Sequence, residues 1–253
     1  LMFSRGPDEK GFFYERNFFM GMRRLSIIDI EGGSQPIKDN TGNISVIFNG
    51  EIYNYIELKN ELISKGYTFK TKSDTEVLIY CYLEYGHEFI NKLNGMFSFC
   101  LFDKSNNEIL LARDRFGKKP LYYYKDEKIF IFSSSLKLIN KYFNNSLKID
   151  EDSFLLLNLF SYVPKERTIY KNVKKLIPGS QIFISKNNIS IKKYFDFKIN
   201  SKKEMNLKEL LTRSINIQSR SDVSVGSLLS GGLDSSIISK LHLGFEVPIP
   251  TYP

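Results

Sequence analysis

The sequence has no tryptophan, and only two cysteines and two histidines among its 253 residues. Two cysteines cannot build a disulfide framework, which favours a reducing compartment. No stretch approaches eighteen uncharged apolar residues, so we expect no membrane span. The first ten residues mix charges with a Gly-Pro pair, a pattern of neither a signal peptide nor a transit peptide. We therefore expect a soluble, cytoplasmic protein.

The scarcity of histidine and cysteine also restricts the chemistry. His87 and His242 offer little to a Ser-His-Asp arrangement, and we expect both at helix ends or facing solvent. Cys81 lies in an apolar helical run and Cys100 in an apolar strand pattern. Free cysteine packs as a small hydrophobe, so both are predicted to be buried core thiols. Zinc-binding spacing is missing.

The net charge of +8 comes mainly from lysines that are spread along the chain. Surfaces that bind nucleic acid concentrate their charge on one stripe, so we expect no nucleic-acid partner. With 42% hydrophobic and 25% charged residues, the chain can form a real core. Its length indicates one large domain or two small ones.

From Phe18 to about Tyr194, short strand patterns alternate with a few helical ones, which predicts an α+β fold with antiparallel hairpins. The expected strands are 44–48, 96–102, 108–112, 121–124, 128–132, 181–185 and 189–194. The expected helices are 56–65, a helix from Ser73 or Asp74 to near Gly86, 133–142 and 150–160. The turn-prone pair Asn49-Gly50 directly follows the first of these strands.

The composition changes near Lys198. Residues 199–203 are polar and linker-like, and 205–219 have a helical pattern. An apolar strand pattern over 223–229 then leads into a glycine loop and another helix. A strand, loop and helix in this order predict the opening of a second domain, of the α/β class.

The sharpest motif is this glycine loop, Ser230-Gly-Gly-Leu-Asp-Ser-Ser236. Two glycines allow a phosphate to approach the backbone, and the N-terminus of the next helix supplies N–H donors. Asp234 could bind Mg²⁺ together with phosphate oxygens. The loop lacks the Gly-Lys-Ser/Thr of a Walker A loop. The alternative interpretation is an ordinary Gly-Gly turn before a capped helix.

A second group of polar residues lies beside apolar strands or at a helix start: Arg24, Asn49, Glu51 and Asp74. A guanidinium can bind an α-carboxylate, and carboxylates can receive an α-ammonium. An Asn amide beside a Gly N–H can form an oxyanion hole. We expect the four side chains to share one cavity for an amino acid. Taken singly, each has an ordinary alternative: Arg24 as a surface charge, Asn49-Gly50 as a hairpin turn and Asp74 as a helix cap.

Together these strings resemble the glutamine-hydrolysing asparagine synthetases, in the order of that family and up to about Ser239. The strings are Ser4-Arg-Gly-Pro-Asp8, Arg23-Arg-Leu-Ser-Ile27, Phe48-Asn-Gly-Glu-Ile-Tyr-Asn54, Ser73-Asp-Thr-Glu76, Leu93-Asn-Gly-Met-Phe97, Ala112-Arg-Asp-Arg-Phe-Gly117, Lys119-Pro-Leu-Tyr122 and Ser230 to Ser236. The first strings would fit any class II amidotransferase. The Ser-Gly-Gly-Leu-Asp-Ser-Ser loop favours the asparagine synthetase branch.

The resemblance implies that residues 1–198 form a type 2 glutamine amidotransferase domain, an N-terminal-nucleophile hydrolase-like αββα sandwich. In that family an N-terminal cysteine attacks the glutamine amide. The implied glutamine-binding residues are Arg24, Leu25, Ser26, Ile27, Ile28, Asn49, Gly50, Glu51 and Asp74. Among these, Asn49 and Gly50 would hold the oxyanion, and Glu51 and Asp74 would contact the α-amine.

Residues 199–253 would then begin the ATP-pyrophosphatase domain of an asparagine synthetase. The residues implied for ATP are Leu229, Ser230, Gly231, Gly232, Asp234 and Ser235, with Mg²⁺ at Asp234. Glutamine, aspartate and ATP are the implied substrates, asparagine, AMP and pyrophosphate the implied products, and a homodimer is a candidate assembly.

Three departures from the family pattern lead us to expect an inactive fragment. The opening Met-Cys-Gly-Ile is missing, Ser4 stands where the family usually has His, and residues 241–253 match nothing expected there. The alternatives are a relative that amidates another carboxylate, in polysaccharide or secondary metabolism, or a member without the catalytic cysteine. A non-catalytic glutamine-binding module is a further alternative.

Overall fold

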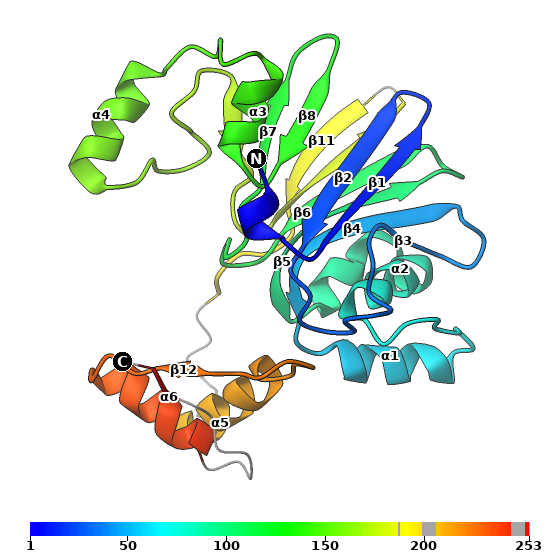
Figure 1. Ribbon diagram of the computed structural model, residues 1–253. Coiled ribbons are helices and arrows are strands. Elements are labelled where there is room, and N and C mark those ends of the chain that lie inside the picture. Colours follow the sequence, from blue (N-terminus) through cyan, green and yellow to red (C-terminus); the bar gives the residue numbers. More distant parts are fainter. Residues whose placement is uncertain (187, 199–205, 244–250, 253) are drawn as a thin grey trace.

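The computed structural model describes residues 1–186, 188–198, 206–243 and 251–252 (Figure 1). Its centre is an antiparallel six-stranded sheet in the order β11-β10-β6-β5-β4-β3. These strands are β11 (Asn188–Lys193), β10 (Ser180–Ser185), β6 (Glu108–Arg113), β5 (Gly95–Asp103), β4 (Ile44–Ile52) and β3 (Ile37–Lys38). β5 is buried along most of its length, as expected of a strand covered on both faces.

Helices cover one face of this sheet. They are α1 (Tyr55–Ser64), α2 (Asp74–Tyr85) and the 3₁₀ helix η2 (Gly86–Lys92). Apolar residues such as Leu62 and Leu78 from the helices pack on Val46 and Leu101 from the sheet in one continuous core. The carboxyl end of β4 and the start of α2 thereby come together.

The other face carries a second β layer. It comprises the hairpin β1 (Glu9–Glu15) and β2 (Phe18–Arg24), and a three-stranded sheet of β7 (Tyr122–Lys125), β8 (Phe130–Ser133) and β9 (Val173–Lys175). A second core joins Met20 and Tyr123 of this layer to Ile47 and Leu111 of the six-stranded sheet. Helix α3 (Leu136–Tyr142) contacts β7 and β8, and a short 3₁₀ helix, η1 (Phe3–Arg5), precedes β1. The layers follow the order α, β, β, α, which confirms the predicted α+β sandwich.

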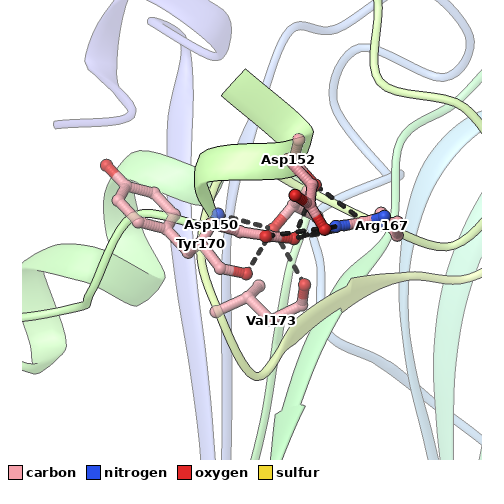
Figure 2. A network of polar contacts seen from close by, with 7 residues as sticks. Asp150, Asp152, Arg167, Tyr170 and Val173 are labelled. Atoms are coloured by element: carbon pink, nitrogen blue, oxygen red, sulfur yellow. Dashed lines mark hydrogen bonds and ion pairs between the residues drawn. The ribbon is translucent and has the colours of Figure 1, made fainter. Parts of the chain in front are cut away.

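Helix α4 (Glu151–Phe160) extends away from the sandwich, and a polar network fixes its start (Figures 1 and 2). The Arg167 guanidinium contacts Asp150, the N-cap residue, at 2.9 Å and Asp152 at 3.2 Å. The Thr168 hydroxyl contacts the Val173 carbonyl oxygen at 2.8 Å. These contacts attach the returning loop both to the first turn of α4 and to β9.

The segment after residue 198 has its own small α/β unit. Helix α5 (Leu207–Gln218) is followed by β12 (Ser227–Leu228) and α6 (Leu233–Leu243), and β12 pairs in parallel with β13 (Thr251–Tyr252). The pairing agrees with the predicted opening of an α/β domain, although the strand expected over 223–229 spans only two residues. The predicted linker, 199–203, lies outside the described residues, as does Met205.

Most elements were predicted to within a few residues, and the main corrections concern strands. The strands β1, β2, β3, β9 and β13 were not predicted. The Asn49-Gly50 pair is not a turn, because β4 continues through it to Ile52. Cys81 and Cys100 are buried, as predicted. His242 lies in the last turn of α6, at the predicted helix end, but its exposed fraction is 5%, so it does not face solvent.

Candidate functional site

The first candidate residue, Asp74, begins α2 beside the end of β4. The Ser73 hydroxyl caps this helix by accepting a hydrogen bond from the Thr75 N–H. The Ile52 N–H donates to Asp74 Oδ2 at 2.9 Å, and the side chain is 5% exposed. Burial raises the pKa of Asp74 to about 6; the Ile52 hydrogen bond opposes this shift, and the nearby Glu51 charge adds to it. Asp74 can therefore exchange a proton near neutral pH.

Three further candidates are consecutive on β4, where Asn49, Gly50 and Glu51 face Ser98, Phe97 and Met96 of β5. The Asn49 side-chain nitrogen is buried and has no hydrogen-bond partner among the described residues. Such an unpaired donor is costly to bury and is uncommon in folded proteins. It is the group that a ligand oxygen would satisfy.

Gly50 keeps Asn49 and Glu51 close to the neighbouring strand. Its φ of +154° is a conformation that other residues rarely adopt, and a Cβ there would collide with the Met96 carbonyl oxygen. Burial raises the pKa of Glu51, and the positive charge of Lys119 opposes that rise. The strand thus presents the amide donor of Asn49 and the carboxyl group of Glu51, whose pKa burial raises.

Arg24 ends β2 and holds the loop that follows. Its guanidinium donates to the carbonyl oxygens of Ile28 at 2.9 Å, Asp29 at 2.8 Å and Ile30 at 3.2 Å. It also pairs with Glu9 at 3.2 Å, and its exposed fraction is 6%. The sequence predicted that this guanidinium would be free to bind the carboxylate of a ligand. In the structure both of its terminal nitrogens already donate to protein oxygens.

Asp29 connects this loop to the segment before α2. Its φ is +53°, and its carboxylate accepts from the N–H groups of Gly32 at 3.1 Å and Lys72 at 2.8 Å. Asp29 was not among the site residues predicted from the sequence. An Asp three residues before a glycine is a turn signal that could have pointed to it.

These elements surround a cavity of about 1530 Å³. Its lining includes eight of the nine residues implied for glutamine: Arg24, Leu25, Ile27, Ile28, Asn49, Gly50, Glu51 and Asp74. Ser26 is not in the lining; its N–H donates to Asp8 at 2.8 Å instead. Clefts that combine a largely apolar wall with a few convergent polar groups are the usual form of small-molecule sites.

Other lining residues were not identified from the sequence. The Gln35 side chain accepts from the Phe48 N–H at 2.7 Å and donates to Thr75 at 3.3 Å, so it joins β4 to α2 at the cavity. Lys119 and Ser98 also line the cavity. Lys119 begins one of the strings that carry the family resemblance, whereas no local pattern marks Gln35 or Ser98, which only the fold brings to the cavity.

Neither cysteine has the character of a nucleophile. Burial raises the pKa of Cys81 to about 12 and raises that of Cys100 further above its ordinary value. Cys100 lines the cavity, but its exposed fraction is 1%. A thiolate is the reactive form of cysteine, so both thiols stay unreactive at neutral pH.

The glycine loop lies apart from this cavity, between β12 and the N-terminus of α6. Gly231 has a φ of +79°, and no heavy atom lies within 4 Å of where its Cβ would be. The Ser235 hydroxyl contacts the Ser230 hydroxyl and the Gly232 carbonyl oxygen, each at 3.1 Å. Asp234 stands in the first turn of α6, and Leu229 is half-buried directly before the loop. An open backbone at the start of a helix suits a phosphate group.

The loop places main-chain N–H groups, serine hydroxyls and the carboxylate of Asp234 at the start of α6. Within residues 1–186, 188–198, 206–243 and 251–252, no three His, Cys, Asp or Glu side chains cluster in a way that could hold a metal ion. Asp234 could supply one carboxylate to a Mg²⁺ ion whose other ligands are phosphates and water. In the same described ranges, no helix is long and apolar enough to cross a membrane.

Comparisons with known proteins match two segments of the chain. The family model for a glutamine amidotransferase domain matches residues 1–195, and the asparagine synthase model matches residues 206–252. The second match overturns the expectation that residues 241–253 depart from the family pattern.

Three similar proteins illustrate the relationship. Asparagine synthetase [glutamine-hydrolyzing] 1 of Bacillus subtilis is 42% identical over all of this chain and 41% of its own length. A putative asparagine synthetase [glutamine-hydrolyzing] 2 of Methanocaldococcus jannaschii is 38% identical over 96% of this chain and 55% of its own. A solved structure, the glutamine PRPP amidotransferase of B. subtilis, gives a TM-score of 0.44 at 19% identity, covering 86% of this chain and 48% of that one.

The chain thus spans about half the length of the curated relatives that it matches. The amidotransferase match covers most of the chain and includes both segments that converge on the cavity. The chain belongs to the glutamine amidotransferase domain family, and a segment matching the asparagine synthase family follows that domain.

Proposed function

We propose that the cavity binds glutamine, and that the chain is part of a glutamine-hydrolysing asparagine synthetase. In this proposal residues 1–198 form the amidotransferase domain, and residues 199–253 begin the ATP-pyrophosphatase domain. The observation that carries the proposal is the buried, unpaired side-chain nitrogen of Asn49 in the cavity that Glu51 and Asp74 also line. An amide donor near two carboxyl groups complements a ligand that has an oxygen to stabilise and an ammonium to bind.

The protein residues have separate roles in this proposal. Glu51 and Asp74 receive the α-ammonium of glutamine, whose positive charge would offset their mutual repulsion. Asn49 and the Gly50 N–H stabilise the negative charge that develops on the side-chain amide oxygen. Arg24 fixes the loop over residues 25–28, so that this loop lines the α-carboxylate side of the pocket.

The attacking thiol in this proposal is the N-terminal cysteine that the family resemblance implies. Cys81 and Cys100 are unsuited to that role, because both are buried and their pKa values are raised. The contribution of this chain to glutamine hydrolysis is to hold the substrate amide and to stabilise the charge on its oxygen.

The second reaction is assigned to the loop after β12. Leu229, Ser230, Gly231, Gly232, Asp234 and Ser235 would hold ATP, with Mg²⁺ at Asp234. When bound, ATP activates the β-carboxylate of aspartate; ammonia from glutamine then gives asparagine, with release of AMP and pyrophosphate. Support comes from the open glycine backbone at the α6 N-terminus and from the match of residues 206–252. The cytoplasm is the proposed location.

Titration calorimetry with L-glutamine tests the first site. The wild-type chain should give a saturable heat, and Asn49→Ala should weaken binding, since it removes a donor. Asn158→Ala is the matched control, because this Asn is exposed on α4 and its side-chain amide donates to the Phe154 carbonyl oxygen of the same helix. The absence of any saturable heat with the wild-type chain would refute the proposal of a glutamine pocket.

Binding of Mg²⁺-ATP tests the second site separately. Ser235→Ala removes a hydroxyl at the loop and should weaken ATP binding, while glutamine binding stays unchanged. Ser214→Ala on α5 is the matched control within the same segment. Equal ATP affinity in Ser235→Ala and the wild-type chain would remove Ser235 from this site.

A further inference from the structure

A short segment between α5 and β12 reaches back to the glutamine cavity. The Asp222 carboxylate accepts a 2.6 Å hydrogen bond from the Asp29 N–H, and the Asp222 N–H donates to the Ile27 carbonyl oxygen at 3.0 Å. Ile27 lines the cavity, and the carbonyl oxygen of Asp29 is one of the three that accept hydrogen bonds from Arg24. Asp222 therefore binds the main chain of the glutamine loop at two points.

Arg220 makes a parallel contact with the other side of the site. Its guanidinium donates to the Tyr53 carbonyl oxygen at 2.6 Å and binds both carboxylate oxygens of Glu57, at 2.6 and 2.7 Å. Tyr53 is buried and stands two residues after Glu51. A bidentate Arg–carboxylate pair has fixed geometry, so Arg220 holds the end of β4 against the start of α1.

Asp29 extends the influence of Asp222 to the third cavity element. The Asp29 carboxylate accepts from the Lys72 N–H at 2.8 Å, two residues before Asp74. Tyr55 lies near the same groups: burial first, and then the charges of Asp222 and Asp74, raise the pKa of its hydroxyl, while the charge of Arg220 opposes the rise. The phenol of Tyr55 is thus sensitive to both carboxylates.

We propose that Arg220 and Asp222 are positioning residues of the glutamine pocket, supplied by the segment that follows the amidotransferase domain. They act through Tyr53, Ile27 and Asp29 rather than by touching the ligand. The inference rests on the proposed function, since it assumes that the cavity binds glutamine. It adds that the pocket is completed by residues outside the range 1–198.

This arrangement ties the two halves of the chain together. Residues 220–222 and the phosphate-type loop at 230–235 belong to one segment, with only β12 between them. Docking of that segment orders the glutamine loop, so its loss should weaken glutamine binding even when the amidotransferase domain is folded. Residues that modulate such coupling typically change affinity by a factor of a few up to about thirty.

Titration calorimetry with L-glutamine on the 253-residue chain tests the inference. Asp222→Ala and Arg220→Ala should each raise the Kd for glutamine by about threefold to thirtyfold. Asp222→Asn keeps an oxygen acceptor for the Asp29 N–H and should recover most of the affinity. Glu209→Ala removes an acid from the exposed face of α5 and should leave the Kd unchanged.

The outcomes separate the inference from the proposed function. If the wild-type chain does not bind glutamine, the proposed function fails. If it binds, and both alanine variants bind equally well, the positioning role is overturned. A fall in melting temperature with an unchanged Kd would also overturn it, because that result describes a structural contact alone. Far-UV circular dichroism on each variant verifies that the chains compared are folded.

Discussion

The main-chain N–H of Ile52 donates a 2.9 Å hydrogen bond to Oδ2 of Asp74, which joins the last residue of β4 to the first residue of α2. Through this contact the strand that carries Asn49 and Glu51 is fixed to the carboxylate of Asp74. The pair brings together two motifs that are separated by the whole of α1. Asp74 is buried at this junction, and its burial is the main reason that its pKa is raised, while the Ile52 hydrogen bond opposes the rise.

We predict that glutamine binding releases protons near pH 6. Free Asp74, with a pKa of about 6, is partly protonated there, and an α-ammonium beside it favours the ionised form. Affinity should therefore rise as pH increases from about 5 to 7. Calorimetry in two buffers of different ionisation enthalpy measures the release, which Asp74→Asn should reduce. Equal proton release by this variant would assign the proton to another group.

The unliganded chain should show the matching trend in stability. The pKa of Asp74 is about 6 in the folded chain and about 3.8 in the unfolded chain, so the protonated carboxyl group stabilises the fold. This contribution is fully present below the unfolded-state pKa and is lost as the pH rises through about 6. The free energy of unfolding of the wild-type chain, relative to Asp74→Asn, should thus decrease between about pH 4 and 6. Urea titrations across this range measure it; a constant difference would contradict the raised pKa.

Asn49→Ala should separate activity from stability. In a form of the protein that carries the cysteine of the family, this change should lower glutamine turnover by about 10²–10³, the usual effect of losing one oxyanion donor. Because the Asn49 nitrogen has no partner among the described residues, its removal should not lower the melting temperature. Turnover equal to that of the parent would remove Asn49 from the oxyanion role.

Gly50→Ala should destabilise the fold by about 2 kcal/mol or more, because the added Cβ would meet the Met96 carbonyl oxygen at a φ of +154°. Gly66→Ala is the matched control. It also has a positive φ, of +96°, but no heavy atom lies within 4 Å of its Cβ position, so it should cost only about 1 kcal/mol. Urea unfolding compares them, and equal losses would show that contact with β5 does not set the effect.

Arg167→Ala should loosen the start of α4 without affecting the cavity. Its guanidinium links the N-cap residue Asp150 to Asp152 (Figure 2), and neither residue lines the cavity. Hydrogen exchange of α4 amides should accelerate, while exchange in α2 stays at its wild-type rate. Lys171→Ala, in the same returning loop, is the control. Unchanged exchange in α4 would show that other contacts hold the helix.

Local sequence rules predicted those parts of the fold that depend on neighbouring residues. The Ser73 cap of α2 and the glycine after α1 are local signals, and both helices begin and end within a residue or two of the expected positions. The prediction of a turn at Asn49-Gly50 was wrong, although this dipeptide favours a turn when only local preferences act. Here pairing with β5 overrides that preference, and the strand continues to Ile52.

The candidate site shows the same limit. The residue types at Asn49, Glu51 and Asp74 suggested an amino-acid ligand, but their orientation depends on strands and helices distant in sequence. Arg24 donates to carbonyl oxygens of the following loop, and no residue pattern predicts these contacts. Gln35 and Asp222 reach the site only through long-range contacts.

The close approach of Gly50 to β5 has a consequence for how a ligand is received. Since neighbouring main chain on β5 leaves no room for a side chain at this position, the sheet itself dictates where the residue 50 amide sits. The N–H of residue 50 is therefore positioned during folding, so that no further ordering of this donor is needed when a ligand binds.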